Sequence, residues 1–395
     1  MAKSAKISDN LARIKTIFKN PIYQNFIALF SLFLLLHLIY RGYTYERIIV
    51  YVGALTFCLY ILFNKSRAVL SSEIKHEQNN IARYAIITFI SFHVIFLVAR
   101  LNQGHVADIG DTTLKSAQLL FGGLNPYESE IDSVALSYMG PGFGGFKYLP
   151  IMSLIYAPLG LLLDYRGIQV TNLILNLVIA FLIFDIVKEH TKSKFYARLS
   201  VVVYLSPFLI FSLLYAKGVT DQAPVLLMLL AFKLREKFSF LSGLALGLSI
   251  SSKLLPGLIL IPILFNGELR SRYILGGILG LVPIFIAALI SPLAIYNNII
   301  LFNLMRPIPE SSWVLLFSDS GLLVIKLILI SSLTLIYVSG LLKNFDLGTR
   351  FVHSTLVIIL SILLSADTPQ NYNLWWIPLL ICGSTLVVYR QRLPI

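Results

Sequence analysis

Two carboxylates, Asp108 and Asp111, lie three residues apart in a polar segment of an otherwise apolar chain. At this spacing they share one side of a helix. A carboxylate at the rim of a membrane cavity can take a proton from a hydroxyl group as that group attacks a substrate. Asp108 is our first candidate for such a base, because Lys115 offers Asp111 an ordinary ion pair four residues away.

Two other interpretations of these carboxylates stay open. Both acids can be solvated residues at a helix start, where the positive end of the helix dipole favours them. The pair can also help to bind a divalent metal ion through oxygen ligands, although no third carboxylate stands nearby in the sequence.

Two cations are candidates for binding a phosphate. Arg306 lies in a second polar loop, and arginine presents two parallel hydrogen bonds to a phosphate group. Lys253 interrupts an apolar stretch, where a charge usually faces a polar cavity. The alternatives are a snorkelling role for Arg306 and an ion pair of Lys253 with Asp221, which could itself cap a helix start.

The composition predicts an all-α, polytopic transmembrane helical bundle. The chain has 395 residues, of which 57% are hydrophobic and 13% charged, with a mean hydropathy of +0.81. Soluble domains carry roughly 25% charged residues. Apolar runs long enough to cross about 30 Å of hydrocarbon predict about a dozen spans. We place them near residues 22–40, 48–63, 82–100, 168–187, 197–215, 221–234, 239–252, 254–265, 273–290, 320–342, 351–366 and 372–389.

The polar segment 101–147 predicts a large loop with a surface helix. Leucine, alanine and phenylalanine recur at helical spacing over 108–121, which indicates an amphipathic helix along the membrane surface. The pair Gly122-Gly123 ends this helix and Asn125-Pro126 turns the chain. The following segment, 148–163, is short and contains two prolines, so we interpret it as a partly embedded helix that does not cross.

The distribution of charge predicts the orientation. The net charge of +13 is spread over short connectors, which favours the positive-inside rule over a nucleic-acid interface. Both termini are then cytoplasmic, and the candidate residues fall on the non-cytoplasmic side of the cell membrane. The basic clusters are Lys65–Arg83, Lys188–Arg198, Lys233–Lys237, Arg270–Arg272, Lys343–Arg350 and Arg390–Arg392.

Other residue types point to structure rather than chemistry. The two cysteines, Cys58 and Cys382, lie in apolar runs and indicate neither a disulfide nor a metal site. His105 and His353 stand alone in the sequence and are expected to be structural. Four aromatic residues near the ends of predicted spans are typical of a membrane-interface belt. They are Tyr148, Tyr372, Trp375 and Trp376.

The ordered motifs resemble those of the GT-C glycosyltransferases that use polyprenyl-phosphate-linked sugars. The branch most similar is the one containing the mycobacterial phosphatidylinositol mannoside mannosyltransferase. The resemblance covers residues 82–389. Its motifs are Asp108, Gly122-Gly123-Leu124-Asn125-Pro126-Tyr127, Lys147-Tyr148-Leu149-Pro150, Gly218 with Asp221, Ser252-Lys253 with Pro256, Arg306-Pro307-Ile308 with Ser311, and Asn371-Tyr372 before Trp376-Ile377-Pro378.

The resemblance implies one GT-C-like domain over residues 1–395. Residues 1–81 would add a cytoplasmic segment and two extra spans, 82–389 would form the catalytic bundle, and 101–147 the external catalytic loop. The enzyme would move one sugar, mannose or a related one, from the lipid-linked donor to a lipid or glycan hydroxyl, with inversion. No cofactor, metal ion or nucleic acid is implied.

The resemblance also implies roles for single residues. Asp108 would be the general base, although a tyrosine common after the family's aspartate is missing, which leaves Asp111 as the alternative. Lys253 and Arg306 would bind the donor phosphate. Substrate-binding roles fall to Asp221, Asn125, Tyr127, Lys147, Tyr148 and Tyr372. Two other classes of protein remain: a flippase or transporter of lipid-linked sugars, and a polysaccharide polymerase or ligase.

Overall fold

The structure is a computed structural model that describes residues 75–101, 106–132, 136–137, 139–259, 271–305, 319–342, 345–365 and 370–390. All regular secondary structure in these residues is helical. Two of the predicted spans, 22–40 and 48–63, lie outside the described residues, as do Arg306 and His105.

Five helices in the described residues are long and apolar enough to cross a membrane. A helix of 20 residues is about 30 Å long, the thickness of the hydrocarbon core. These five are α4 (Lys75–Arg100), α8 (Tyr165–Thr191), α14 (Ser271–Ile290), α17 (Asp319–Leu342) and α18 (Leu347–Leu364). The shorter helices α9 (Lys194–Leu205), α11 (Gln222–Leu234) and α12 (Ser239–Ile250), together with α19 (Asn373–Arg390), which is as long as α18, fill the bundle between them.

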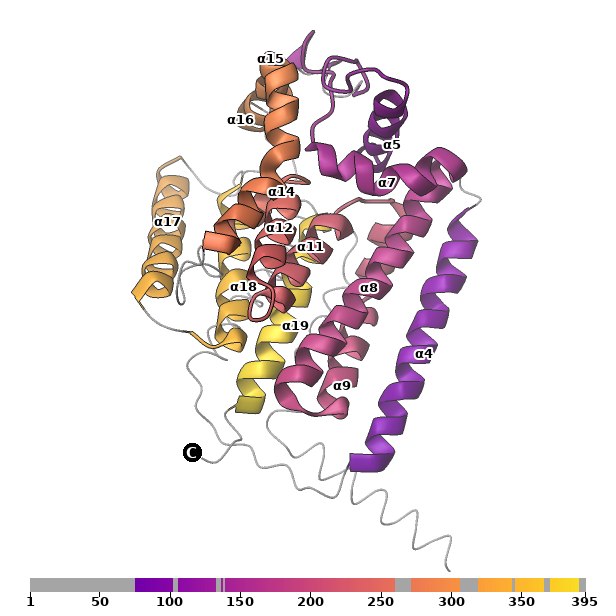
Figure 1. Ribbon diagram of the computed structural model, residues 1–395, viewed down its shortest axis with the longest axis vertical. Coiled ribbons are helices and arrows are strands. Elements are labelled where there is room, and N and C mark those ends of the chain that lie inside the picture. Colours follow the sequence, from indigo (N-terminus) through magenta and orange to yellow (C-terminus); the bar gives the residue numbers. More distant parts are fainter. Residues whose placement is uncertain are drawn as a thin grey trace, which may run out of the picture.

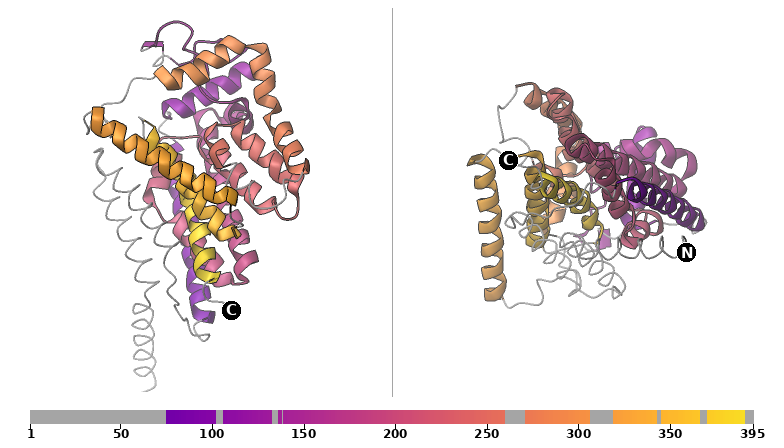
Figure 2. Two further views of the ribbon diagram at one scale, coloured as in Figure 1. Left: turned by 90° about the vertical axis from the view of Figure 1, so that its left-hand side faces the viewer. Right: turned by 90° about the horizontal axis from the view of Figure 1, so that it is seen from below.

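Most of the long helices run up and down the bundle, and short elements gather at one end of it (Figure 1). We call this the site end; the opposite end is where α8 passes into α9. The short elements are α5 (Asp108–Phe121), α7 (Pro150–Leu163), α15 (Pro292–Ile295), the π-helical turn η5 (Tyr296–Leu301) and α16 (Phe302–Met305). Figure 2 shows from two further sides that α17 lies at the periphery of the bundle.

Helix α7 begins and ends at the site end, in agreement with the interpretation of 148–163 as a segment that does not cross. Its 14 residues span only about 21 Å, and it lies across the end of α8 (Figure 1). Asp164 alone separates the two helices and adopts a positive φ of 57°. A side chain on Gly167 would collide with the carbonyl of Leu159, so only glycine permits this close turn.

The predicted span 197–215 is interrupted in the structure. Helix α9 ends before Pro207, which cannot continue a helix because it lacks an N–H group. The short α10 (Phe208–Phe211) and the π-helical turn η3 (Ser212–Ala216) follow, and an irregular segment, 217–221, leads into α11.

Amide side chains on α8 satisfy the backbone of this broken segment. Asn172 donates to the carbonyls of Leu214 at 3.0 Å and Val219 at 2.9 Å. Gln169, one turn earlier, donates to the carbonyl of Tyr215 at 2.7 Å. Irregular backbone at membrane depth is stable only when protein groups replace the missing hydrogen bonds. The amides of α8 therefore hold the segment that ends at Asp221.

Glycines allow α12 and α14 to pack backbone to backbone. Gly243 and Gly247 on α12 face Gly276 and Gly280 on α14, each pair four residues apart and so on one helix face. A methyl group on Gly243 would collide with the carbonyl of Tyr273. This contact fixes the end of α12, where Lys253 follows.

Candidate active site

The carboxylate of Asp221 is fully buried and lies at the centre of the site end. Its Oδ1 accepts hydrogen bonds from Lys253 Nζ at 2.5 Å and from the indole Nε1 of Trp375 at 2.8 Å. Its Oδ2 accepts the amide of Asn371 at 2.7 Å. Asp221 thus joins the start of α11, the turn after α12 and the start of α19, which are remote in sequence.

The ammonium of Lys253 is surrounded by aromatic rings. Nζ lies 4.8 Å from the ring centroid of Tyr148, 5.7 Å from that of Trp375 and 6.0 Å from that of Tyr372. Ring faces attract cations at these distances. The side chain of Lys253 is 11% exposed, so a small part of it remains accessible.

Backbone hydrogen bonds at the start of α7 bring Lys253 to this place. The N–H of Leu149 donates to the carbonyl of Ser252, and the N–H of Ile151 donates to that of Ser251, both at 3.2 Å. The first N–H groups of a helix and the last carbonyls of another have no partners within their own helices. The N–H groups at the start of α7 and the carbonyls at the end of α12 are therefore each other's hydrogen-bond partners, and Lys253 is the next residue after Ser252.

The pairing of Lys253 with Asp221, one of the two sequence interpretations of Lys253, is thus present in the structure. A charge taken out of water needs a partner of opposite sign close by. A phosphate group at Lys253 would share the ammonium with Asp221.

Asp108 is the first residue of α5, as predicted, and its side chain is exposed. Its Oδ1 accepts the N–H of Ile109 at 2.8 Å. Among the described residues no cation forms an ion pair with it. The carboxylate is therefore exposed and lies at the positive end of the dipole of α5.

Helix α5 is attached to the segment that precedes Asp221. The N–H of Ala107 donates to the carbonyl of Lys217 at 2.6 Å. The hydroxyls of Thr113 and Thr220 lie 3.5 Å apart, both buried. Asp108 and Asp221 are consequently held on adjoining elements at the same end of the bundle.

Asp111 has two partners. Lys115 forms the predicted ion pair at 2.7 Å, which the structure confirms. The hydroxyl of Tyr165 donates to Asp111 Oδ1 at 3.0 Å. The hydrogen bond to Asp111 raises the pKa of Lys115.

The turn after α5 is fixed against α14. Gly122 and Gly123 end α5 as predicted, and Gly123 has a φ of +76°. The N–H of Tyr127 donates to Asn125 Oδ1 at 3.1 Å, and the amide of Asn125 donates to the hydroxyl of Ser291. Ser291 in turn donates to Glu128 Oε1 at 2.5 Å. The side chain of Asn125 therefore has structural partners.

Asn298 connects the polar loop to η5. It is 1% exposed, and its Oδ1 accepts the N–H of Gly145 at 3.1 Å and the ammonium of Lys147 at 2.6 Å. Its amide donates to the carbonyls of Tyr127 at 3.1 Å and Ala294 at 3.0 Å. Nothing in the sequence pattern singled out this residue, because its partners lie about 150 positions away.

Lys147 has neutral partners. Its ammonium donates to the carbonyl of Phe143 and to Asn298 and lies 4.6 Å from the ring centroid of Phe302. Burial lowers the pKa of Lys147 to about 8, although the charge of Asp132 opposes that shift. Tyr127, whose hydroxyl donates to the carbonyl of Tyr148 at 3.0 Å, is likewise part of the protein interior.

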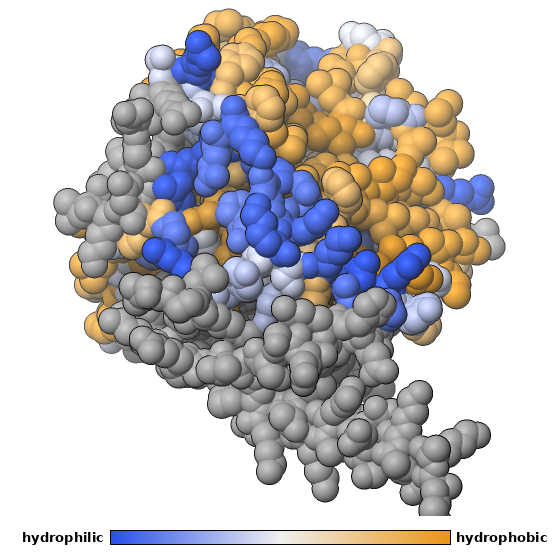
Figure 3. All heavy atoms as spheres, turned by 60° about the horizontal axis from the view of Figure 1, so that its bottom comes forward, coloured by the Kyte–Doolittle hydropathy of each residue, from blue (hydrophilic) through white to orange (hydrophobic). Residues whose placement is uncertain are grey.

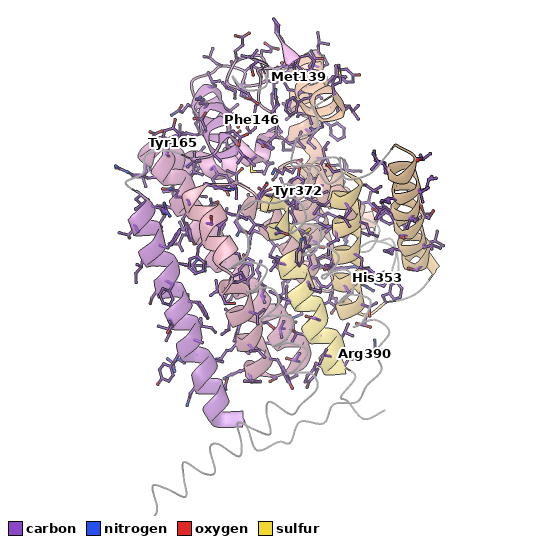
Figure 4. All side chains as sticks on the ribbon, turned by 180° about the vertical axis from the view of Figure 1, so that it is seen from behind. Met139, Phe146, Tyr165, His353, Tyr372 and Arg390 are labelled. Carbon is purple, nitrogen blue, oxygen red and sulfur yellow. The ribbon has the colours of Figure 1, made fainter. Side chains whose placement is uncertain are left out.

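The structure brings nine of the predicted site residues to the site end; the tenth, Arg306, lies outside the described residues. Figure 4 shows Tyr165, Phe146 and Tyr372 toward this end, with His353 and Arg390 farther from it. The interpretation of the tryptophans as an interface belt is wrong. Trp375 is completely buried and Trp376 is 3% exposed, because they pack inside the bundle.

Two crystal structures of ArnT from Cupriavidus metallidurans have a similar fold. The form bound to undecaprenyl phosphate has a TM-score of 0.51 at 15% identity, covering 78% of this chain and 60% of that one. The apo form has a TM-score of 0.52 at 14% identity, covering 80% and 61%. This chain therefore spans less than two thirds of the length of ArnT. No family model matches the sequence, and no curated protein does. The likeness concerns the fold, which is an all-helical GT-C-like bundle.

Proposed function

We propose that the chain is an integral-membrane glycosyltransferase that takes a sugar from a polyprenyl-phosphate-linked donor. The observation that carries the proposal is the gathering of an accessible carboxylate, Asp108, and a largely buried cation, Lys253, at one end of a GT-C-like bundle. The crystallised ArnT holds undecaprenyl phosphate, which supports a lipid phosphate as the donor's carrier.

In the proposed reaction an acceptor hydroxyl attacks the anomeric carbon of the donor sugar. A new bond forms between the hydroxyl oxygen and that carbon, and the bond to the phosphate oxygen breaks. The hydroxyl proton passes to the carboxylate of Asp108, and the polyprenyl phosphate leaves with both electrons of the broken bond. A single displacement of this kind inverts the anomeric centre.

Asp108 is preferred to Asp111 as the base because its carboxylate is accessible. Asp111 already accepts hydrogen bonds from Lys115 and Tyr165. Lys253 and Arg306 are proposed to stabilise the negative charge that develops on the leaving phosphate. Mannose or a related sugar, and the relation to the phosphatidylinositol mannoside branch, follow from the motif resemblance alone.

The site end is proposed to face the non-cytoplasmic side, with both termini cytoplasmic. The opposite end carries a hydrophilic patch (Figure 3). Basic residues gather in the connectors and helix ends there, as the positive-inside rule expects for a cytoplasmic face. They include Lys188, Lys192, Lys194, Lys233, Lys237 and Arg390.

The test is transfer by the purified full-length protein in vesicles. Undecaprenyl phosphate carrying a radiolabelled mannose is the donor, and a membrane lipid extract supplies acceptors. We expect label to move to a product larger by one sugar. Label that crosses the bilayer without covalent transfer would favour a flippase, and a ladder of long products would favour a polymerase. Use of nucleotide-linked mannose without the lipid carrier would contradict the proposal.

A further inference from the structure

Helix α17 carries a single charged residue within its apolar stretch. Ser320–Ser339 satisfies the length and hydropathy of a membrane span, and Lys326 is its only ionisable side chain of the Asp, Glu, Lys or Arg type. A charge inside a span is costly, so such residues usually face a partner, a cavity or a ligand.

Lys326 lies at the border between the packed face and the exposed face of α17. Half-buried Leu322, Leu329 and Leu333 stand four, three and seven residues away, respectively, at helical spacing on the side toward the bundle. Leu329 packs against the main hydrophobic core. On the other side, Leu327 is 54% exposed. A group that approaches from lipid along this border can therefore reach the ammonium.

The position of Lys326 along α17 is at the site end. The helix begins at Asp319 at that end (Figure 1), and seven residues correspond to about 10 Å along the axis. Near its other end, the hydroxyl of Tyr337 donates to the carbonyl of Leu258 at 2.8 Å. Leu258 lies in the 3-10 helix η4 (Leu255–Ile259), which follows Lys253. Helix α17 is thus attached to the segment that follows Lys253.

The two lysines differ in how their charge is balanced. Asp221 lies 2.5 Å from the ammonium of Lys253. Within the described part of the chain, no carboxylate forms an ion pair with Lys326 and no hydrogen bond holds it. An anionic ligand would supply the missing charge.

We propose that Lys326 binds the phosphate of a polyprenyl-phosphate lipid at the edge of the bundle. The ammonium would donate hydrogen bonds to the phosphate oxygens, and the isoprenoid chain would lie along the exposed leucines of α17. A polyprenyl phosphate is chosen over a glycerophospholipid because the proposed donor is carried on such a lipid. The choice of this lipid rests on the proposed function; the anion site rests on α17 itself.

Native mass spectrometry of the detergent-purified full-length protein tests the proposal. The probes are undecaprenyl phosphate, undecaprenol and phosphatidylglycerol, and the variants are K326Q, K326R and K188Q. Lys188, which lies over the ring of Phe184 at the opposite end, is the matched charge control. Loss of a charged hydrogen bond should weaken retention of undecaprenyl phosphate about tenfold in K326Q. K326R and K188Q should retain it as the wild type does, and undecaprenol should bind weakly to all.

Several results would overturn the proposal. Equal retention of undecaprenyl phosphate by K326Q and wild type would remove the anion site. If K326Q weakened the retention of phosphatidylglycerol as much as that of undecaprenyl phosphate, the site would bind ordinary phospholipid and not a polyprenyl phosphate specifically. The melting temperatures of all variants are measured as well. Because K326R keeps the positive charge, normal binding by K326R shows that a loss in K326Q comes from the missing charge. Binding that depends on Lys326 in a protein without transferase activity would refute the proposed function alone. Normal transfer and binding by K326Q would refute this inference alone.

Discussion

Lys253 Nζ and Asp221 Oδ1 lie 2.5 Å apart, in a place where the carboxylate is fully buried and the lysine nearly so. The two residues come from the turns at the start of α11 and the end of α12. Three aromatic rings and the amide of Asn371 complete their surroundings. The pair therefore connects the segments that form the site end, independently of any bound ligand.

Replacing Asp221 should destabilise the protein strongly. In D221N the buried ammonium of Lys253 loses its counter-charge, which costs about 3 kcal/mol or more. Thermal unfolding in detergent measures the effect. The control is K237Q, which removes the 66%-exposed partner of Glu189 at the opposite end and should change the melting temperature little. Equal melting temperatures for the two variants would contradict this account of the pair.

Asn298 should be as important to the polar loop as any predicted site residue. N298A leaves the N–H of Gly145 and the carbonyl of Tyr127 without a partner and removes one hydrogen bond of the Lys147 ammonium, at a cost of about 2 kcal/mol or more. N303A is the control, because Asn303 makes a single bond to the carbonyl of Ile299 one turn earlier. Limited proteolysis of the loop 122–147 measures local opening. Equal cleavage rates in the two variants would argue against the connection.

Lys147 should give stability a pH dependence above neutrality. Its pKa of about 8 in the folded protein lies below the value of about 10.4 for a free lysine. Between these values the unfolded chain binds the extra proton, so this group's contribution to the free energy of unfolding rises with pH. Below pH 8 both states are protonated and the burial penalty is full.

The variant K147M isolates that contribution. The difference in melting temperature between wild type and K147M should move in favour of the wild type between pH 8 and 10. A difference that stays constant over this range would show that Lys147 titrates with its ordinary pKa.

The glycine contact between α12 and α14 offers a test of how the turn at Lys253 is held. In G276A the new methyl group would collide with the carbonyl of Phe240, whereas in G277A it would lie 3.8 Å from the carbonyl of Gly243, an ordinary contact. Thermal unfolding should therefore show a clear loss for G276A, of about 1–3 kcal/mol, and little for G277A. Similar melting temperatures would mean that the helices separate at no cost.

Features with local causes were predictable from the sequence. The bounds of α5 follow from leucine spacing and the two glycines after it, and the structure has the same helix, Asp108–Phe121. The ion pair of Asp111 with Lys115 follows from four-residue spacing. The break after α9 has a sequence signal in Pro207. The close contact between α12 and α14 has one in two Gly-x-x-x-Gly patterns, one on each helix.

Features that depend on distant partners were not predictable. Trp375 resembles an interface residue until Asp221 is placed beside its indole. Asn298 is an ordinary polar residue until the loop around Lys147 folds against it. Their roles depend on tertiary contacts between segments about 150 residues apart, for which hydrophobic periodicity carries no signal.

The most direct test of the central claim is sugar transfer from labelled undecaprenyl-phosphate-mannose by wild type, D108N and D111N. General-base catalysis contributes about 10²–10⁴-fold, so D108N should lose at least about a hundredfold in rate while keeping its melting temperature. D111N should stay within about tenfold of the wild type, because its carboxylate serves Lys115 and Tyr165. Full activity in D108N, with or without loss in D111N, would contradict the assignment of Asp108 as the base.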